Sequence, residues 1–330
     1  MRVLLTGGTG QIGAAIARAL LNAGHDVSAL LRDPDRPGLL TGLPLRWAQG
    51  DITRPDTLGA AASGAEAVIH TAGLVSYAAQ DAARLHAVNV EGTRNVLNAA
   101  AAAGARRVVL TSSIAALGEV KADELGDEDT LWGWGGLGLY YLESKFEAEQ
   151  LALGDTRLEV IALNPGIVFG ADDLSGHTSA LFSQVLGGGP PVVPCGATTV
   201  CALPDVAAAH VSALSRGRPG HRYVLGGATP TFLELYAAIA ASLGVPAPRR
   251  VVGEGLLYPF SIVEGWLARL GQRRPRITPG PGAYELPQPP LSLRQGRLRA
   301  GLHPTILRGE PRGDPHLDAR PRAPQGLIGV

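Results

Sequence analysis

Cysteine is scarce in this sequence. Its 330 residues include only Cys195 and Cys201, with no second pair and no neighbouring cluster of histidines. A disulfide framework needs several cysteine pairs, and a structural zinc site needs four ligands, so both are excluded. Two thiols in a chain of this length suit a reducing cytosol. We expect both to serve as small apolar core residues and expect no metal site.

Net charge is also lacking, because 29 basic and 29 acidic side chains balance each other. A protein that grips nucleic acid or an anionic membrane usually carries a broad basic surface. The balance therefore predicts neither partner and favours a small-molecule substrate.

No stretch is both long and uninterrupted enough to cross a bilayer. The first apolar run, RVLLTGG, is too short for a signal peptide. The stretch GLLYPFSIVEGWLARLG is broken by Pro259, Glu264 and Arg269, which indicates an amphipathic helix. These features predict a cytoplasmic protein.

Short apolar strands alternate with longer helical stretches through the first half of the chain. The predicted strands span residues 2–6, 26–31, 45–50, 65–72, 106–113 and 158–165. Helices are expected between them, with Gly24 and Gly104 ending two of these helices. Such alternation predicts an α/β protein with a Rossmann-type, doubly wound parallel sheet.

The texture changes after Pro165, where glycine and proline become frequent. We expect residues 1–165 to form a dinucleotide-binding domain, completed by segments near 198–227. Residues 166–310 would form mostly a smaller, irregular C-terminal substrate-binding region that includes a helix over 232–244. The arginine- and proline-rich end, 311–330, predicts a disordered tail.

The first predicted strand runs into TGGTGQIG, which can be aligned in two registers. Gly8, Gly10 and Gly13 spell the general dinucleotide pattern G-x-G-x-x-G, whereas Gly7, Gly10 and Gly13 spell G-x-x-G-x-x-G. In either register the turn lets backbone amides at a helix N-terminus approach a pyrophosphate. The strand–turn–helix context predicts a dinucleotide cofactor.

The choice of cofactor should depend on the end of the second strand, which reads Leu31, Arg32, Asp33, Pro34, Asp35, Arg36. NAD binding usually requires an acidic residue there, which accepts a hydrogen bond from the ribose 2′-hydroxyl. Leu31 cannot accept one, and an arginine can pair with a 2′-phosphate through two hydrogen bonds. The segment therefore favours NADP, while NAD stays possible if Asp33 lies at the end of a longer strand.

Tyr141 and Lys145 lie four residues apart on a predicted helix, so their side chains share one face. A nearby ammonium favours tyrosinate and would lower the phenol's pKa towards the range of acid–base catalysis. Taken alone, the pair could be a packing tyrosine and a surface lysine. We expect the neighbouring Tyr140 to be a packing residue. The glycine turn and the hydroxyls of TSS at 111–113, which precede the pair in order, favour the catalytic interpretation.

Taken together, these motifs resemble those of the extended short-chain dehydrogenases/reductases. That superfamily includes NDP-sugar epimerases and dehydratases, dihydroflavonol reductases and 3β-hydroxysteroid dehydrogenases. The resemblance covers roughly residues 1–305, through TGGTGQIG, GDIT, HTAG, VNVEGT, TSSIAALG, YLESK and NPGIVFG. The run LLRDPDR is most similar to the dihydroflavonol-reductase-like members.

The resemblance implies a role for each matching residue. Tyr141 would be the acid/base, Lys145 its partner and a cofactor contact, and Ser113 the catalytic hydroxyl, with Ser112 structural. The other residues that the resemblance places near the cofactor are Gly7, Thr9, Gly10, Gln11, Ile12, Gly13, Arg32, Arg36, Asp51, Ile52, Ala72, Gly73, Asn89, Pro165 and Ile167. Of these, Asp51 and Ile52 would border the adenine, and Pro165 and Ile167 would lie near the nicotinamide.

Two departures bear on the substrate. Sugar-nucleotide enzymes commonly carry an arginine and a histidine where this chain has Thr198 and Ala202, and an aspartate where it has Leu31. The sequence therefore predicts an NADP-preferring oxidoreductase that acts on a carbonyl or secondary alcohol. Trp132, Trp134, Leu137 and Leu139 favour an apolar or cyclic substrate, unless they only pack the loop against its own domain.

Two alternatives stay open at the level of sequence: an NDP-sugar epimerase or dehydratase with tightly bound NAD, and a non-catalytic nucleotide sensor. Relatives commonly pair through helices that match 84–103 and 141–154 here, so the resemblance also implies a homodimer.

Overall fold

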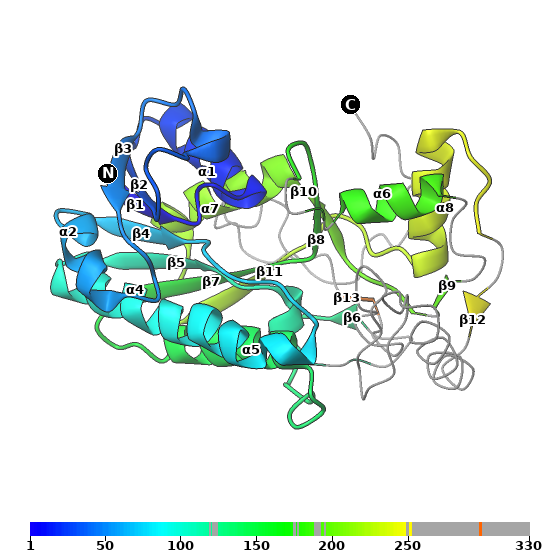
Figure 1. Cartoon of the computed structure of the whole chain (residues 1–330). Helices are drawn as coiled ribbons and strands as arrows, with labels where there is room; N and C mark the ends of the chain where they lie inside the picture. Colours follow the sequence, from blue (N-terminus) through cyan, green and yellow to red (C-terminus); the bar gives the residue numbers. More distant parts are fainter. Residues whose placement is uncertain are drawn as a thin grey trace.

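Seven parallel strands form the central sheet in a computed structural model of the chain (Figure 1). The structure describes residues 1–118, 120, 125–173, 176, 178–187, 193–194, 196–248, 251–252 and 297–298. The strand order is β11-β7-β5-β4-β1-β2-β3. The strands are β1 (Arg2–Thr6), β2 (Asp26–Leu31), β3 (Arg46–Gln49), β4 (Ala67–His70), β5 (Arg107–Thr111), β7 (Glu159–Pro165) and β11 (His221–Leu225). The predicted doubly wound α/β fold is confirmed.

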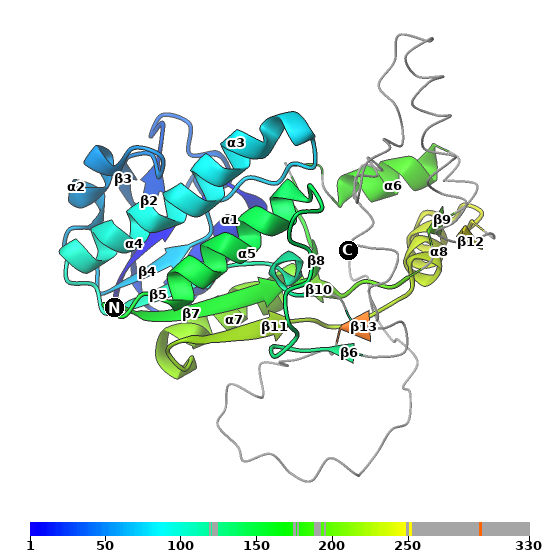
Figure 2. The ribbon, with the colours of Figure 1, turned by 90° about the horizontal axis from the view of Figure 1, so that it is seen from below.

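Helices cover both faces of this sheet, as Figure 2 shows. One face carries α1 (Gln11–Asn22) and α7 (Leu203–Arg216), which pack against each other. The opposite face carries α2 (Leu58–Ala62), α4 (Gly92–Ala102) and α5 (Tyr140–Leu153). The predicted end of α1 is confirmed, because Gly24 directly follows its last turn in the left-handed region, at φ +77°.

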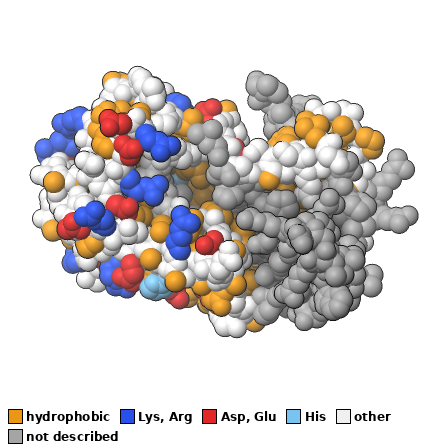
Figure 3. Space-filling model, viewed as in Figure 1, with side chains coloured by type: hydrophobic (Ala, Val, Ile, Leu, Met, Phe, Trp, Pro, Cys, Tyr) orange, Lys and Arg blue, Asp and Glu red, His pale blue; other side chains and the backbone are white. Residues whose placement is uncertain are grey.

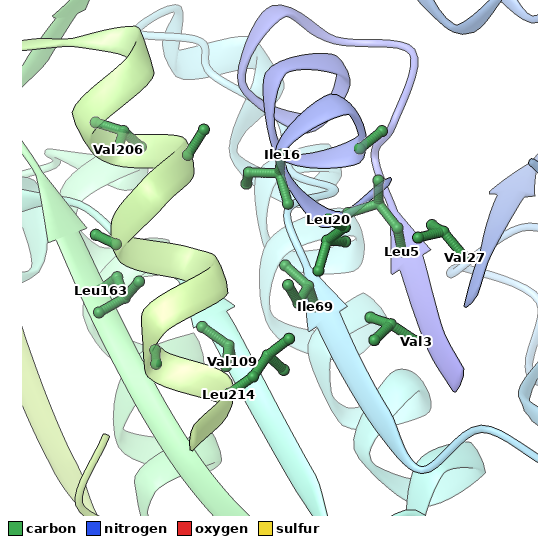
Figure 4. Close-up of a cluster of buried hydrophobic side chains, with 14 of the residues drawn as sticks. Val3, Leu5, Ile16, Leu20, Val27, Ile69, Val109, Leu163, Val206 and Leu214 are labelled. Atoms are coloured by element: carbon green, nitrogen blue, oxygen red, sulfur yellow. The ribbon is translucent and has the colours of Figure 1, made fainter. Parts of the chain in front are cut away.

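Strand residues divide between two cores because successive side chains point to opposite faces. Val3 and Leu5 pack with Ile16 and Leu20 of α1, and Figure 4 shows this cluster continuing to Leu214 of α7. Each fully buried side chain of this size contributes roughly 1.5–3 kcal/mol to folding. The intervening residues of the same strands face α4 and α5 in the second core. Burial on both faces explains why the middles of β1, β4 and β5 are continuous apolar runs.

The strand order reverses between β1 and β4. From β1 the chain builds outward through β2 and β3, and it then returns to build the other half through β4, β5 and β7. Open α/β sheets bind ligands outside the carboxyl ends of their strands at such a reversal. The glycine turn follows β1 and the segment of Ala72 and Gly73 follows β4, so both lie where the fold predicts a ligand.

The second half of the chain adds smaller units. β8 (Ile167–Phe169) pairs in parallel with β10 (Val200–Ala202), and α6 (Ser179–Leu186) packs against α8 (Phe232–Leu243). The remaining short pairs are β9 (Val193–Pro194) with β12 (Val251–Val252), and β6 (Leu125–Gly126) with β13 (Arg297–Leu298). β11 returns to the main sheet beside β7, as the sequence predicts.

The helix predicted over 232–244 is present as α8. A capping box of Thr231 and Glu234 begins this helix, and Gly244 at φ +66° ends it. The amphipathic helix predicted near 255–271 and the tail predicted at 311–330 lie outside the described residues.

One predicted helix is less regular than the sequence suggests. Between α3 (Ala82–Leu85) and α4, residues His86–Glu91 form a π-helical turn. The Thr93 hydroxyl donates a 2.6 Å hydrogen bond to the Asn89 carbonyl, and side-chain bonds of this kind compete with the regular helical ladder. The wider turn carries Asn89, whose side chain lies beside the site described next.

Candidate active site

The glycine turn after β1 fits the register of Gly7, Gly10 and Gly13. Gly7 has φ +72°, and a Cβ there would lie 2.5 Å from the Ala72 amide nitrogen. A Cβ on Gly13 would lie 2.3 Å from the Gly7 carbonyl oxygen. Gly8 would meet only the flexible end of the Leu40 side chain, at 2.9 Å. The backbone thus demands glycine at the first and last positions of the G-x-x-G-x-x-G pattern.

The N-terminus of α1 opens directly from this turn. Gly10 is its N-cap, no side chain caps it, and its first turn holds no acidic residue. The amides of its first turn therefore keep donors for an anion. The Gln11 side chain donates 2.9 Å hydrogen bonds to the carbonyls of Gly170 and Ala171. Gln11 can thus meet a cofactor through its backbone, while its side chain ties the turn to the segment after β8.

The end of β2 presents basic side chains beside this turn. Leu31 is buried, whereas Arg32 and Arg36 are exposed. Within the part of the chain that the structure describes, neither guanidinium forms an ion pair. The Asp33 carboxylate accepts a 3.1 Å hydrogen bond from the Asp35 amide, which closes a local turn. This geometry gives a phosphate two available guanidinium groups.

Asp51 and Ile52 follow β3 at the same edge of the sheet. Asp51 Oδ1 accepts hydrogen bonds from the Thr53 amide and hydroxyl, at 2.9 and 2.8 Å. Ile52 is buried, and a Cβ on Gly92 would lie 2.8 Å from its Cδ1 atom. The pair forms a fixed corner next to α4.

Gly73 follows β4 and lies close to residues of the π-helical turn and of α5. A Cβ on Gly73 would lie 3.3 Å from Asn89 Oδ1 and 4.0 Å from Lys145 Nζ. Asn89 does not reach outward. Its amide donates to the Leu74 carbonyl and to the Ser144 hydroxyl, each at 2.9 Å, so it binds the loop to α5. Residues far apart in sequence are therefore close together around Gly73.

Tyr141 and Ser113 are brought together as predicted. Tyr141 lies in the first turn of α5, and its hydroxyl lies near the side chain of Ser113, which follows β5. Burial raises the pKa of Tyr141 above its ordinary value, and the interaction with Ser113 lowers it in part. The prediction that Lys145 lowers the pKa of Tyr141 is wrong. Burial has the larger effect and raises this pKa, and the partial lowering comes from Ser113.

Lys145 is tied to the end of β5. Its ammonium donates a 2.9 Å hydrogen bond to the Thr111 carbonyl. Burial lowers the pKa of Lys145 to about 8, and the Glu149 carboxylate opposes that change. The lysine is thus held by the sheet edge one helical turn from Tyr141, within reach of the Gly73 segment.

Pro165 and Ile167 lie where β7 ends and β8 begins. The Ile167 amide donates a 2.8 Å hydrogen bond to the Thr199 carbonyl, which fixes this crossing. The predicted site residues from eight segments thus lie at the carboxyl edge of the sheet.

Tyr77 is a site residue that sequence reasoning missed. Its ring lies edge-on to the Tyr141 ring, with centroids 5.2 Å apart and planes at 78°. Burial and the nearby Tyr141 raise the pKa of Tyr77 well above its ordinary value, so it stays neutral. A tyrosine in an irregular loop carries no periodic signal, and only the fold brings it to the site.

The two tryptophans before Tyr141 pack their loop against the rest of the domain. Trp132 stacks on Phe146 at 4.3 Å between centroids, and Trp134 is buried with its indole nitrogen donating to the Leu117 carbonyl. Leu137 is exposed. These contacts remove much of the support that these residues gave to an apolar substrate. Tyr140, expected to pack, is instead 40% exposed.

Three further residues behind the catalytic group were not singled out from sequence: Glu149, Asn164 and Arg222. Glu149 is fully buried on α5 and accepts hydrogen bonds from the other two. Its place four residues after Lys145 was the available signal, because that spacing puts both on one helix face.

Other chemistry is sparse in the described residues. Among them, no group of His, Cys, Asp and Glu is placed to hold a metal, and none of the helices could span a membrane. Cys201 is buried, and burial raises the pKa of its thiol to about 12; Cys195 lies outside the described residues. On the face in Figure 3, basic and acidic side chains intermingle over the sheet half.

Comparisons with known proteins identify the family of this chain. The sequence profile of the NAD dependent epimerase/dehydratase family matches residues 3–226. A protein of Synechocystis sp. with the provisional name dihydroflavonol 4-reductase is 35% identical over 268 residues, covering 79% of this chain and 78% of its own. A 3β-hydroxysteroid dehydrogenase/Δ5→4-isomerase of Mycobacterium tuberculosis is 36% identical over 197 residues, covering 57% of this chain and 52% of its own.

Solved structures give the same result. The crystal structure of gox2253 is 32% identical, with a TM-score of 0.71, and covers 84% of this chain and 85% of that one. MoeE5, solved with UDP-glucose and NAD, is 27% identical with a TM-score of 0.62, over 77% and 85% of the two chains. The chain therefore belongs to the NAD-dependent epimerase/dehydratase family, as an enzyme of the extended short-chain dehydrogenase/reductase type.

Proposed function

We propose that this protein is an NADP(H)-preferring oxidoreductase that interconverts a carbonyl group and a secondary alcohol. The observation that carries the proposal is the group of Ser113, Tyr141 and Lys145 at the carboxyl edge of the sheet, with the Ser113 side chain near the Tyr141 hydroxyl and Lys145 one helical turn away. When bound, the nicotinamide supplies or accepts the hydride.

The chain's own residues would orient the substrate and move the proton. Ser113 would donate a hydrogen bond to the substrate oxygen, and the Tyr141 hydroxyl would give that oxygen a proton during reduction. The reverse reaction would return the proton to Tyr141. The Lys145 ammonium, held by the Thr111 carbonyl, would bind the ribose of the nicotinamide.

The preference for NADP(H) rests on the end of β2. Leu31 is buried where an acidic residue would bind a ribose 2′-hydroxyl, and Arg32 and Arg36 are exposed next to it. A guanidinium pairs well with a phosphate through two parallel hydrogen bonds. The competing possibility is that this chain binds NAD, the cofactor present in the MoeE5 structure.

The substrate we propose is small and cyclic or apolar. Two relatives are named for reactions on a dihydroflavonol and a steroid, and the Tyr77 ring provides an aromatic wall beside Tyr141. A sugar diphosphate is disfavoured because Thr198 is buried where sugar-nucleotide enzymes carry a binding arginine.

The test is a titration of the purified protein with NADPH and with NADH, followed by a panel of cyclic ketones and sugar nucleotides. We expect tighter binding of NADPH and its oxidation by at least one ketone. Co-purified NAD, with turnover of UDP- or GDP-sugars and none of ketones, would instead establish the epimerase or dehydratase alternative. Cofactor binding without any turnover would indicate a nucleotide sensor.

A further inference from the structure

Glu149 places a carboxylate inside the protein, directly behind the catalytic group. Its exposed fraction is 0%, although it belongs to α5, a helix whose outer face is solvated. A buried carboxylate is costly unless hydrogen bonds and opposite charge compensate it. Its partners therefore indicate what it does.

Both carboxylate oxygens accept a hydrogen bond from a different strand. Arg222 of β11 donates from Nη1 to Oε1 at 3.1 Å, and Asn164 of β7 donates from Nδ2 to Oε2 at 2.5 Å. Two donors on two oxygens suit the ionised form, which is purely an acceptor. Burial raises the pKa of Glu149, while the nearby Ser112 hydroxyl, the hydrogen bond from Asn164 and the charge of Arg222 lower it in part.

The Asn164 amide also bonds to the catalytic segment. Its Nδ2 donates a 2.9 Å hydrogen bond to the backbone carbonyl of Ser113. One amide group has two hydrogens, so Asn164 can bridge Glu149 and Ser113 at the same time. The carboxylate thereby fixes the backbone from which the Ser113 hydroxyl reaches Tyr141.

We infer that Glu149 is a positioning residue for the proposed reductase: it holds Ser113 through Asn164 and places a negative charge beside the Lys145 ammonium. The inference rests on the proposed function, because Ser113 and Lys145 matter only if that chemistry occurs. Glu149 contacts neither reacting atoms nor cofactor.

The charges around Lys145 come from several elements. Tyr141 and Glu149 lie on its own helix, His70 on β4 and Arg222 on β11, and Tyr77 faces Tyr141 from the loop after β4. Burial keeps His70 neutral, with a pKa of about 3, and raises the pKa of both tyrosines. Among these groups Glu149 supplies the negative charge that raises the pKa of Lys145 against burial.

The first experiment measures Lys145 without any reaction. Lys121 and Lys145 are the two lysines of the sequence, so labelling with ¹³C-lysine gives two resolvable side-chain signals for an NMR titration. In Glu149→Gln, we expect the pKa of Lys145 to fall by roughly one unit or more from its value of about 8, since a nearby opposite charge is removed. The matched control is Glu147→Gln, an exposed carboxylate on the same helix paired with His86, which should leave the titration unchanged. An unchanged titration in Glu149→Gln would overturn the inference.

The second experiment follows turnover with the ketone found for the wild type. In Glu149→Gln, kcat should fall about tenfold, a part of the 10²–10⁴-fold that positioned acid–base groups contribute. The alkaline limb of kcat/KM should move to lower pH, with the KM for the cofactor unchanged. Glu149→Asp should restore the limb because it keeps the charge. Loss of kcat with no change of the pH profile would reduce Glu149 to a structural residue.

A second variant covers the case in which Glu149→Gln does not fold. Asn164→Ala interrupts the connection to Ser113 and leaves both charges, so kcat should fall while the pKa of Lys145 stays near that of the wild type. A wild-type kcat would overturn the part of the inference that concerns Ser113. Failure of the wild type on every ketone would reject the proposed function, and the lysine titration would still decide the role of the Glu149 charge.

Discussion

The Lys145 ammonium donates its hydrogen bond to the carbonyl oxygen of Thr111, the last residue of β5, at 2.9 Å. This bond fastens the catalytic helix to the strand that leads into Ser113. The lysine is therefore positioned by the sheet itself, and its partly buried ammonium has a pKa near 8. The phenol of Tyr141 is buried as well, and burial raises its pKa, while the interaction with Ser113 lowers that pKa in part.

Replacing Tyr141 by phenylalanine should abolish turnover while leaving cofactor affinity within a few-fold. The substitution removes only the hydroxyl that exchanges the proton and keeps the ring that packs against Tyr77. Loss of a positioned acid–base group costs roughly 10²–10⁴-fold or more in kcat. Steady-state kinetics and NADPH fluorescence titration measure the two effects.

The neighbouring Tyr140 provides the matched control, because it lies on the same helix and is exposed. Tyr140→Phe should keep wild-type kcat. A thousandfold loss of cofactor affinity in Tyr141→Phe would show that the residue has a binding role and contradict the assignment.

Arg32→Ala should weaken NADPH binding far more than NADH binding. A charge-assisted hydrogen bond is worth about 1.5–3 kcal/mol, so we expect a loss of roughly ten- to hundredfold for NADPH. Arg94→Ala on α4, where the arginine pairs with Glu91, tests whether removal of any positive charge has this effect. Equal losses for both cofactors in Arg32→Ala would mean that the turn does not bind the 2′-phosphate.

Alanine at two positions of the glycine turn should separate folding from binding. In Gly13→Ala, the new Cβ would lie 2.3 Å from the Gly7 carbonyl, so the turn must shift and both Tm and cofactor binding should fall. In Gly10→Ala, the nearest atom is the same carbonyl at 3.5 Å, an ordinary contact. We expect this variant to keep its Tm but bind NADPH at least about tenfold more weakly, because the methyl group stands where α1 begins.

Thermal unfolding followed by circular dichroism, together with the fluorescence titration, distinguishes the two variants. Unimpaired NADPH binding in Gly10→Ala would place the pyrophosphate away from the N-terminus of α1.

Much of the fold was predictable because its signals are local. The six predicted strands of the first half and the helix that carries Tyr141 depend on apolar alternation and on glycine stops, which act within a few residues. The return of β11 to the sheet was also predictable, because HRYVLGG is strand-like. The π-helical turn at His86–Glu91 was not predictable, because apolar periodicity does not distinguish it from a regular helix.

The candidate site likewise contains residues that local motifs reveal and residues that only the fold brings together. Gly7, Tyr141 and Lys145 belong to spaced motifs, whereas the Glu149–Arg222 pair joins residues 73 positions apart. Its existence depends on which strands the fold brings together. The direction of the Tyr141 pKa was missed for a related reason, since the extent of burial is a property of the folded chain.

Two buried histidines should make stability depend on pH in the acidic range. Both nitrogens of the His210 ring face neutral partners. Nδ1 donates to the Val206 carbonyl at 2.7 Å, and Nε2 lies 2.8 Å from the Thr111 hydroxyl. His70 lies between the hydroxyls of Thr6 and Thr93. Burial lowers the pKa of His210 from 6.5 to about 4 and that of His70 to about 3.

The sign follows from linkage. The unfolded chain binds protons on these rings below pH 6.5, while the folded chain resists protonation. The two rings therefore do not lower the free energy of unfolding above pH 6.5, and they lower it as the pH falls below that value. As the pH falls from 6.5 towards 4, the free energy of unfolding should drop by up to about 1.4 kcal/mol per pH unit for His210. Urea unfolding at a series of pH values in this window measures the slope. The slope should be flatter for His210→Gln than for the wild type. Both proteins share the opposite contribution of Glu149, whose pKa is raised by burial, so subtracting one slope from the other removes it. An identical slope in the variant would show that His210 titrates alike in the folded and unfolded chain.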